Sequence, residues 1–286
     1  MIVTRLLALI LMTCLAVTGP RSWAADASTW VEGRGSRVRL IAGDAEPRER
    51  WAGVEIALDP GFKTYWRTPG ESGLPPVFDW SRSTNVAAVE PLWPAPSRFE
   101  DGGGVAYGYS GGVVLPVRVT LCEPDKPVRL ALALEYGVCK DLCIPAQADL
   151  SLDLPERAQP ASSGLIRQAR ERVPKPQALG AEGDLAVLDV APAPEGGKPR
   201  ITVRVRAPAG AAPRLFVEGP DDWFFAAAEA MDPAVPSSGS AQGTFRVEVD
   251  PPPGGARTPV PLRLTLVAGD RAIETTASLD GTLSSR

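Results

Sequence analysis

The chain of 286 residues contains no histidine and only four cysteines. The absence of histidine excludes every nucleophile–histidine pair and every histidine-ligated metal site, whatever the fold. Any chemistry that the protein performs must therefore depend on cysteine, carboxylate, tyrosine or lysine side chains.

A strong excess of one charge is also absent. The formal net charge is −4, the charged fraction is 22 % and the apolar fraction is 44 %, which are ordinary values for a soluble globular protein with a buried core. Without a basic run, the chain offers no electrostatic footprint for nucleic acid, and we expect no nucleic acid partner. Its length predicts two domains rather than one.

Long apolar runs are absent after the N-terminus. Residues 1–24 combine Arg5, an apolar segment from Leu6 to Val17 and a small-residue site that ends at Ala24. This pattern predicts a secretory signal peptide that is cleaved near Ala24. The apolar segment is shorter than the ~20 residues of a membrane-spanning helix. We therefore expect an exported protein in a compartment where disulfides persist.

Helical periodicity is nearly absent, and alternating or β-branched runs separated by Gly, Pro and Asp recur instead. The runs occupy residues 36–43, 52–58, 111–121, 127–138 and 147–154, and then 184–191, 199–207, 213–219, 244–250 and 261–269. Apolar side chains on one face and polar side chains on the other are typical of antiparallel sandwiches. The sequence predicts an all-β protein with a β-sandwich followed by a second β-sandwich-like domain.

The domain boundaries follow from the breaks in this pattern. We expect a first domain at residues 25–155, a linker at 156–182 with a short helix from Ser163 to Arg172, and a second β-rich domain at 183–286. Residues 234–243, rich in Ser, Gly and Ala, are expected to form a flexible loop.

Two of the four cysteines lie in the stretch "LEYGVCKDLCIPAQADLSL", residues 134–152. A hairpin loop between the two flanking runs can bring Cys139 and Cys143 within the ~4.4 to 6.8 Å between Cα atoms that a disulfide requires. A bridge that closes so small a loop stabilises little, which favours redox use over a structural role. Lys140 would stabilise a neighbouring thiolate, whereas Asp141 would oppose it.

Two other interpretations of the pair stay open. The bridge can be a structural staple, as in many exported proteins, or two thiolates can hold a soft ion such as Cu(I), although no histidine is available to complete the ligand set. Cys122 is expected to be a free, partly buried thiol without a catalytic role.

The motifs around the pair resemble a known family. "YGVCKDLCIP", preceded by "GFKTYWRTPGESGLPP" (61–76) and "FEDGGGVAYGYSGGVVLPVRV" (99–119), is similar to the N-terminal periplasmic domain of the DsbD thiol:disulfide interchange proteins, and most like the ScsB-like branch with its Cys-x3-Cys pair. The resemblance covers residues 30–155. It implies an immunoglobulin-like sandwich in which Cys139 and Cys143 are the catalytic cysteines.

The resemblance also implies a loop that covers the cysteine pair. The matching segment runs from Phe99 to Tyr109, and an aromatic position beside the site matches Tyr65. The residues expected to cover or shape the site are Phe99, Glu100, Asp101, Tyr107, Tyr109 and Tyr65.

The function implied by the resemblance is thiol:disulfide exchange of the protein-disulfide reductase type, in the periplasm and without a cofactor or metal. Members of the family continue into a membrane-embedded region and a thioredoxin-like domain. Because neither is found in this sequence, we expect a separate membrane electron donor, with periplasmic thioredoxin-like or disulfide-isomerase proteins as acceptors. The alternative is a non-catalytic sandwich adaptor, or a copper-handling or assembly factor.

Overall fold

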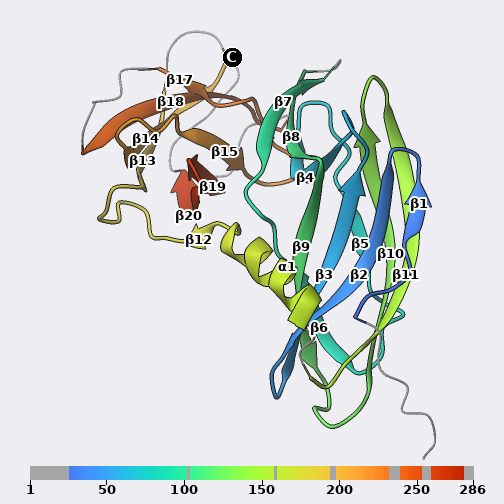
Figure 1. Ribbon diagram of the computed structural model, residues 1–286. Helices are drawn as coiled ribbons and strands as arrows, with labels where there is room; N and C mark the ends of the chain where they lie inside the picture. The colour runs from blue at the N-terminus through green and yellow to red at the C-terminus, as the bar shows by residue number, and fades with distance from the viewer. Residues whose placement is uncertain are drawn as a thin grey trace, which may run out of the picture.

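The computed structural model describes residues 26–101, 104–157, 160–193, 198–231, 239–252 and 259–279. These residues form two β-sandwiches joined by one helix (Figure 1). The prediction of an all-β chain with two sandwiches is confirmed. The predicted signal peptide lies outside the described residues. Within the described ranges, no helix has the length and apolarity needed to cross a bilayer.

The first sandwich consists of two sheets. One sheet has the order β1 (Val31–Gly33), β2 (Ser36–Ala45), β3 (Glu49–Leu58), β9 (Gly112–Leu121) and β6 (Val86–Pro91). The other sheet has the order β11 (Cys143–Leu154), β10 (Val128–Cys139), β4 (Lys63–Gly70), β8 (Gly104–Ser110) and β7 (Ser97–Asp101), with β5 (Val77–Asp79) paired to β10. Neighbouring strands in both sheets are antiparallel.

Alternation along the strands builds the core between these sheets. Leu130, Leu132 and Leu134 of β10 are each at most 1 % exposed, and every second residue of β11 from Ala148 to Leu154 is buried beside them. A fully buried leucine contributes about 1.5 to 3 kcal/mol relative to an exposed one. The core therefore fixes the register of β10 and β11, and with it the ends of these strands where the cysteines lie.

Helix α1 (Pro160–Glu171) packs on the first sandwich. Ile166 is buried against Ile41 and Trp51, and the guanidinium of Arg170 lies 3.6 Å from the centroid of the Trp51 ring. The chain then enters β12 (Lys175–Pro176), which runs parallel to a strand of the second sandwich. The segment predicted as a linker thus contacts both bodies.

The second sandwich has its own core cluster. One sheet has the order β12, β20 (Arg271–Leu279), β19 (Val260–Ala268) and β15 (Arg214–Glu218). The other has the order β13 (Ala186–Pro192), β14 (Arg200–Pro208), β18 (Ser240–Asp250) and β16 (Phe224–Phe225), with β17 (Glu229–Ala230) paired to β18. The prediction of a flexible loop at 234–243 is wrong for residues 240–243, because these residues begin β18 and pair with β14. Residues 234–238 lie outside the described residues.

The two sandwiches pack against each other through apolar side chains. Phe216 of β15 and Val267 of β19 belong to the core cluster of the first sandwich. Figure 1 shows the β7–β8 hairpin on the side of the first sandwich that faces the second. The second sandwich therefore adjoins the sheet that carries the cysteines.

Candidate functional site

The cysteine pair closes the hairpin between β10 and β11. Cys139 and Cys143 are directly opposite in the strand register, their Cα atoms are 4.1 Å apart, and a disulfide joins them. The three residues between them form the turn, and Leu142 in this turn is 71 % exposed. The hairpin predicted from the spacing is present, with the disulfide at the end that carries the turn.

The two sulfur-bearing residues differ in burial. Cys139 is 3 % exposed and packs with Tyr65 and Ala106, whereas Cys143 is only partly buried at the edge of the same cluster. A nucleophile from another protein must approach a sulfur along an open path. Cys143 is therefore the more exposed of the two cysteines.

Tyr65 of β4 contacts the disulfide directly. Its hydroxyl donates a hydrogen bond to Sγ of Cys143 at 2.8 Å, and the side chain is 2 % exposed. The ring lies between two glycines: a Cβ atom added at Gly137 would lie 2.7 Å from the ring, and one added at Gly73 would lie 2.5 Å from it. The absence of side chains at these two positions gives the ring its place beside the sulfur.

The β7–β8 hairpin lies beside the cysteine pair. Phe99 of β7 is half-buried and packs in the cluster that contains both cysteines, with its ring centroid 6.2 Å from that of Tyr65. The ammonium of Lys63 lies 4.5 Å from the centroid of the Phe99 ring. Phe99 and Tyr65 thus form an apolar cover on one side of the disulfide.

The predicted covering loop contains two acidic residues, Glu100 and Asp101. Glu100 is exposed, and its backbone carbonyl accepts a long hydrogen bond of 3.5 Å from Lys63. The side chain of Asp101 and the residues at 102–103 lie outside the described residues. A role for either carboxylate at the site stays a prediction.

The prediction that Tyr107 and Tyr109 lie beside the cysteines is wrong. Both side chains belong to the core of the first sandwich, and the Tyr109 hydroxyl donates to the carbonyl of Pro94 at 2.8 Å. The reason is strand alternation, because β8 turns Ala106 toward the cysteines and the two tyrosines toward the opposite face. Burial raises the pKa of Tyr107 to about 12 and raises the pKa of Tyr109 well above its ordinary value.

Cys122 is a free thiol, and it is exposed. The prediction of a partly buried thiol is wrong, because Cys122 follows the last residue of β9 and lies in a surface turn where its backbone N–H donates to the carbonyl of Asn85. Among the residues that the structure describes, no group of three or more Cys, Asp and Glu side chains is arranged to hold a metal ion.

Sequence reasoning missed Lys63, Gly137 and Arg67. Lys63 is the register partner of Cys139 on β4, which places a cation in the strand next to the pair. In the sequence, the indication that Lys63 lies near the site was its position two residues before Tyr65. Gly137 sits two residues before Cys139, where the alternating apolar pattern of β10 is interrupted by a glycine. Arg67 binds Glu218 and Glu274 of the second sandwich and lies over the ring of its own neighbour Trp66.

The family relationship follows from the segment that carries this geometry. Residues 37–155 match the family described as "Thiol:disulfide interchange protein DsbD, N-terminal". This segment is a DsbD N-terminal domain. The match covers the first sandwich from β2 to β11, including the Cys139–Cys143 hairpin, Tyr65 and the β7–β8 hairpin, and it confirms the resemblance predicted from the sequence. A comparison with curated proteins found no match.

The whole two-sandwich arrangement also has a solved counterpart. The N-terminal periplasmic domain of ScsB from Proteus mirabilis aligns over 89 % of this chain and 98 % of its own, with a TM-score of 0.71 and 22 % identity. The similarity therefore extends beyond the DsbD N-terminal domain to the second sandwich, at the level of the fold. The C-terminal domain of the AgI/II polypeptide BspA from Streptococcus agalactiae aligns with 9 % identity and a TM-score of 0.20, too low for a shared fold.

Proposed function

We propose that this protein is an exported thiol:disulfide exchange protein of the protein-disulfide reductase type, in which Cys139 and Cys143 carry the electrons. The observation that carries the proposal is the asymmetry of the disulfide within a DsbD N-terminal domain. Cys143 is accessible and hydrogen-bonded by Tyr65, whereas Cys139 is buried beside it. In such a pair, an incoming thiolate attacks the sulfur of Cys143, and the sulfur of Cys139 is the leaving group.

Reduction of the pair starts with a thiolate of the donor protein. The thiolate attacks Sγ of Cys143, the bond between the two cysteines breaks, and Cys139 leaves as a thiolate that takes up a proton. A second donor thiolate then attacks the donor sulfur of this mixed disulfide and releases Cys143. Two electrons enter the pair, and the donor becomes a disulfide.

Delivery to an acceptor reverses these steps. The thiolate of Cys143 attacks an acceptor disulfide, and Cys139 then attacks Cys143 to restore the disulfide and release the reduced acceptor. A hydrogen bond from the Tyr65 hydroxyl stabilises negative charge on Cys143, since bonds to charged groups are the stronger kind. Tyr65 therefore favours the thiolate form that performs this attack.

The proposed partners follow from the electron balance. A protein with disulfides to reduce outside the cytoplasm needs a donor that carries electrons across the membrane, so we assign the donor role to a separate membrane protein. Periplasmic thioredoxin-like or disulfide-isomerase proteins are the acceptors. The predicted signal peptide at residues 1–24 supports a periplasmic location.

A purely structural role for the disulfide is less consistent with its position. β10 and β11, each 12 residues long, are already paired along their whole length, and the bridge closes a loop with a sequence separation of 4. Cross-linking neighbours in a short loop restricts the unfolded chain much less than closing a long loop does. The bridge therefore adds little to a hairpin that the core already fixes.

The proposal is tested by trapping a mixed disulfide in cells. Exported Cys139→Ala, in a Cys122→Ser background, retains the accessible thiol but lacks the cysteine that resolves the intermediate. We expect reducible adducts with thioredoxin-like proteins from this variant and far fewer from the matched Cys143→Ala variant, whose remaining thiol is buried. An absence of adducts from both variants, or tight binding of Cu(I) by the reduced pair in place of adducts, would overturn the proposal.

A further inference from the structure

Strand β4 contains a bulge that projects toward the second sandwich. Tyr65 is opposite Gly108 of β8 and Gly70 is opposite Ala106, so the register shifts between these pairs and residues 66–69 have no partner on β8. An extra segment in one strand bends that strand and re-aims the side chains beside it. The bulge begins at the residue next to Tyr65, whose hydroxyl contacts Cys143.

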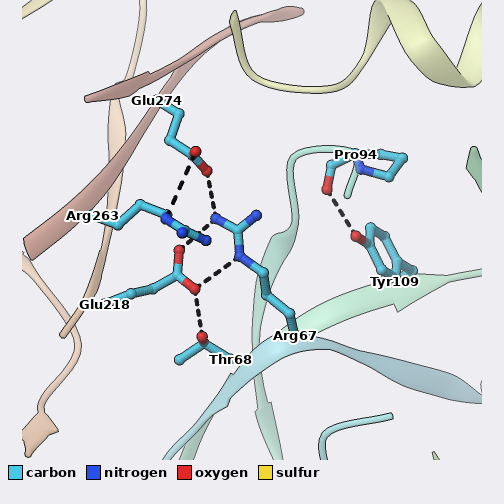
Figure 2. A network of polar contacts seen from close by, with 7 residues as sticks. All are labelled: Arg67, Thr68, Pro94, Tyr109, Glu218, Arg263 and Glu274. Atoms are coloured by element: carbon cyan, nitrogen blue, oxygen red, sulfur yellow. Dashed lines mark hydrogen bonds and ion pairs between the residues drawn. The ribbon is translucent and has the colours of Figure 1, made fainter. Parts of the chain in front are cut away.

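The bulge is held by carboxylates of the second sandwich (Figure 2). Arg67 donates two hydrogen bonds to Glu218 of β15, at 2.9 and 2.6 Å, and a third to Glu274 of β20 at 2.5 Å. The hydroxyl of Thr68 donates to the same Glu218 carboxylate at 2.6 Å. Glu218 thus binds both Arg67 and Thr68 of the bulge, and Glu274 binds Arg67 as well.

This contact is stronger than an ordinary surface ion pair. The side chains of Arg67, Glu218 and Glu274 are 18 %, 11 % and 27 % exposed, and the pairing with Glu218 is bidentate. Burial alone lowers the pKa of Arg67, but hydrogen bonds and attraction from the two glutamates outweigh it, and the pKa is raised. Partial burial and fork geometry favour a contact that holds one position.

Aromatic side chains also connect the second sandwich with the bulge and with the β7–β8 hairpin. Phe216 of the second sandwich packs edge-on against Trp66 of the bulge and against Tyr107 of the β7–β8 hairpin, with centroid separations of 5.8 and 4.9 Å. Trp66 and Tyr107 therefore occupy positions that the second sandwich helps to define.

The other end of the bulge holds the β7–β8 hairpin. The backbone N–H of Glu71 donates to the carbonyl of Val105 at 2.8 Å, and the N–H of Val105 donates to the Glu71 carboxylate at 3.0 Å. The bulge thus connects with Tyr65 at its start and, just after its end, with the hairpin that carries Phe99. Both parts of the cover over the disulfide adjoin one segment.

We propose that the second sandwich positions the redox site, with Arg67 as the positioning residue: its contact with Glu218 and Glu274 fixes the bulge and so keeps Tyr65 on Cys143 and Phe99 over the pair. The inference rests on the proposed function and gives the second sandwich a part in it. Release of the contact loosens the cover and weakens the hydrogen bond to the Cys143 thiolate.

The test uses the full chain, chemically reduced, in a Cys122→Ser background. Glu218→Gln with Glu274→Gln removes both charges at nearly constant volume, and Arg67→Gln removes the opposite charge from the other side. We expect Cys143 to be alkylated faster at saturating pH in both variants, and the pKa of its thiol to be higher. The rate and the acid dissociation constant should each change by about twofold to thirtyfold, the range usual for such coupling. Thiolate ultraviolet absorbance against pH gives the pKa.

Glu55→Gln is the matched control. It breaks the ion pair between Arg39 and Glu55, which is 2.7 Å long and similarly half-buried but lies on the other sheet of the first sandwich. Its alkylation rate and thiol pKa should equal those of the wild type. A wild-type rate and pKa in both interface variants, with circular dichroism showing intact folds, would overturn the inference.

If the charge-neutralised variants do not fold, Arg67→Lys tests the positioning role instead. Arg67→Lys keeps the charge but loses the bidentate fork, so it should fold and still shift the rate and the pKa in the same direction by a smaller amount. An unchanged Arg67→Lys would contradict the positioning role. These readouts do not depend on partner proteins, so they are separate from the trapping experiment: a wild-type pair that forms no adducts would remove the exchange function and leave the positioning result measurable.

Discussion

The hydroxyl of Tyr65 donates a hydrogen bond to Sγ of Cys143 at 2.8 Å, while Cys139 is buried and packs against the same side chain. One side chain thus contacts the accessible sulfur and shields the other. The ring reaches this place because Gly73 and Gly137 leave room on its two sides. Reactivity and protection of the pair therefore depend on the same residue.

Removal of this hydroxyl should raise the pKa of the Cys143 thiol. In Tyr65→Phe the ring still fills its place, but the thiolate loses a hydrogen bond of the charged kind, worth about 1.5 to 3 kcal/mol, which corresponds to about one to two pKa units. Titration of the reduced pair by thiolate absorbance measures the shift. Tyr109→Phe serves as the comparison, since it removes a tyrosine hydroxyl that donates to Pro94 on the opposite face of β8, and it should leave the titration unchanged. An unchanged titration in Tyr65→Phe would show that the hydrogen bond is absent from the reduced state.

Truncation of Phe99 should expose the pair. Phe99→Ala removes the ring that packs against the cluster of Tyr65, Ala106 and Cys139, so alkylation of the reduced protein by a small thiol reagent should be severalfold faster at saturating pH. Tyr109→Phe is the control, because it removes only the hydrogen bond to Pro94 on the opposite face of β8. Equal rates in Phe99→Ala and the wild type, with the fold intact, would mean that the β7–β8 hairpin does not limit access.

Loss of the disulfide should cost little stability. In Cys143→Ala the bridge that closes the short turn is gone, and the chain-entropy relation gives a cost of at most about 2 kcal/mol for a loop of this size. Urea unfolding of the variant and of the oxidised wild type, both with Cys122→Ser, measures the difference. A loss of the whole folded state would instead support a structural staple.

Stability should fall at alkaline pH, in part because of Tyr107. Burial, opposed by the charge of Arg98 and assisted by that of Glu71, raises the pKa of Tyr107 from 10.0 to about 12 in the folded state. Below pH ~10 the phenol is neutral in both states and its contribution is complete; between pH ~10 and ~12 only the unfolded state ionises, and about 2 to 3 kcal/mol is lost.

Tyr107→Phe tests this pH dependence. The variant should lose less free energy of unfolding than the wild type between pH ~9 and pH ~11.5, with Cys122→Ser in both proteins. Some alkaline loss should persist, because burial also raises the pKa of Tyr109 and of Tyr136. Equal losses in the variant and the wild type would show that Tyr107 is not buried in solution.

Strand patterns made the fold and the cysteine hairpin predictable. The alternation in β10 and β11 and the three residues between Cys139 and Cys143 define a hairpin by themselves. The same rule would have placed Tyr107 and Tyr109 on the face opposite Ala106, but the family resemblance assigned this segment to a covering loop rather than to a strand. Cys122 was misplaced because its burial depends on the turn after β9, which alternation does not describe.

Contacts between the two sandwiches could not be predicted from the sequence. Arg67 and Glu218 are 151 residues apart, and in the sequence each looks like an ordinary charged residue on a strand. Their pairing depends on the bulge in β4 and on the angle between two separately folded cores. The same is true of Phe216, whose pattern on β15 predicts burial but not burial against Trp66.

The reduction potential of the Cys139–Cys143 pair tests the central claim most directly. The pair is equilibrated with defined thiol buffers in the Cys122→Ser protein, and the oxidised fraction is quantified after alkylation. An exchange site should have a potential above about −300 mV, within reach of thioredoxin-like partners. A potential below about −300 mV, typical of structural disulfides, would contradict the account.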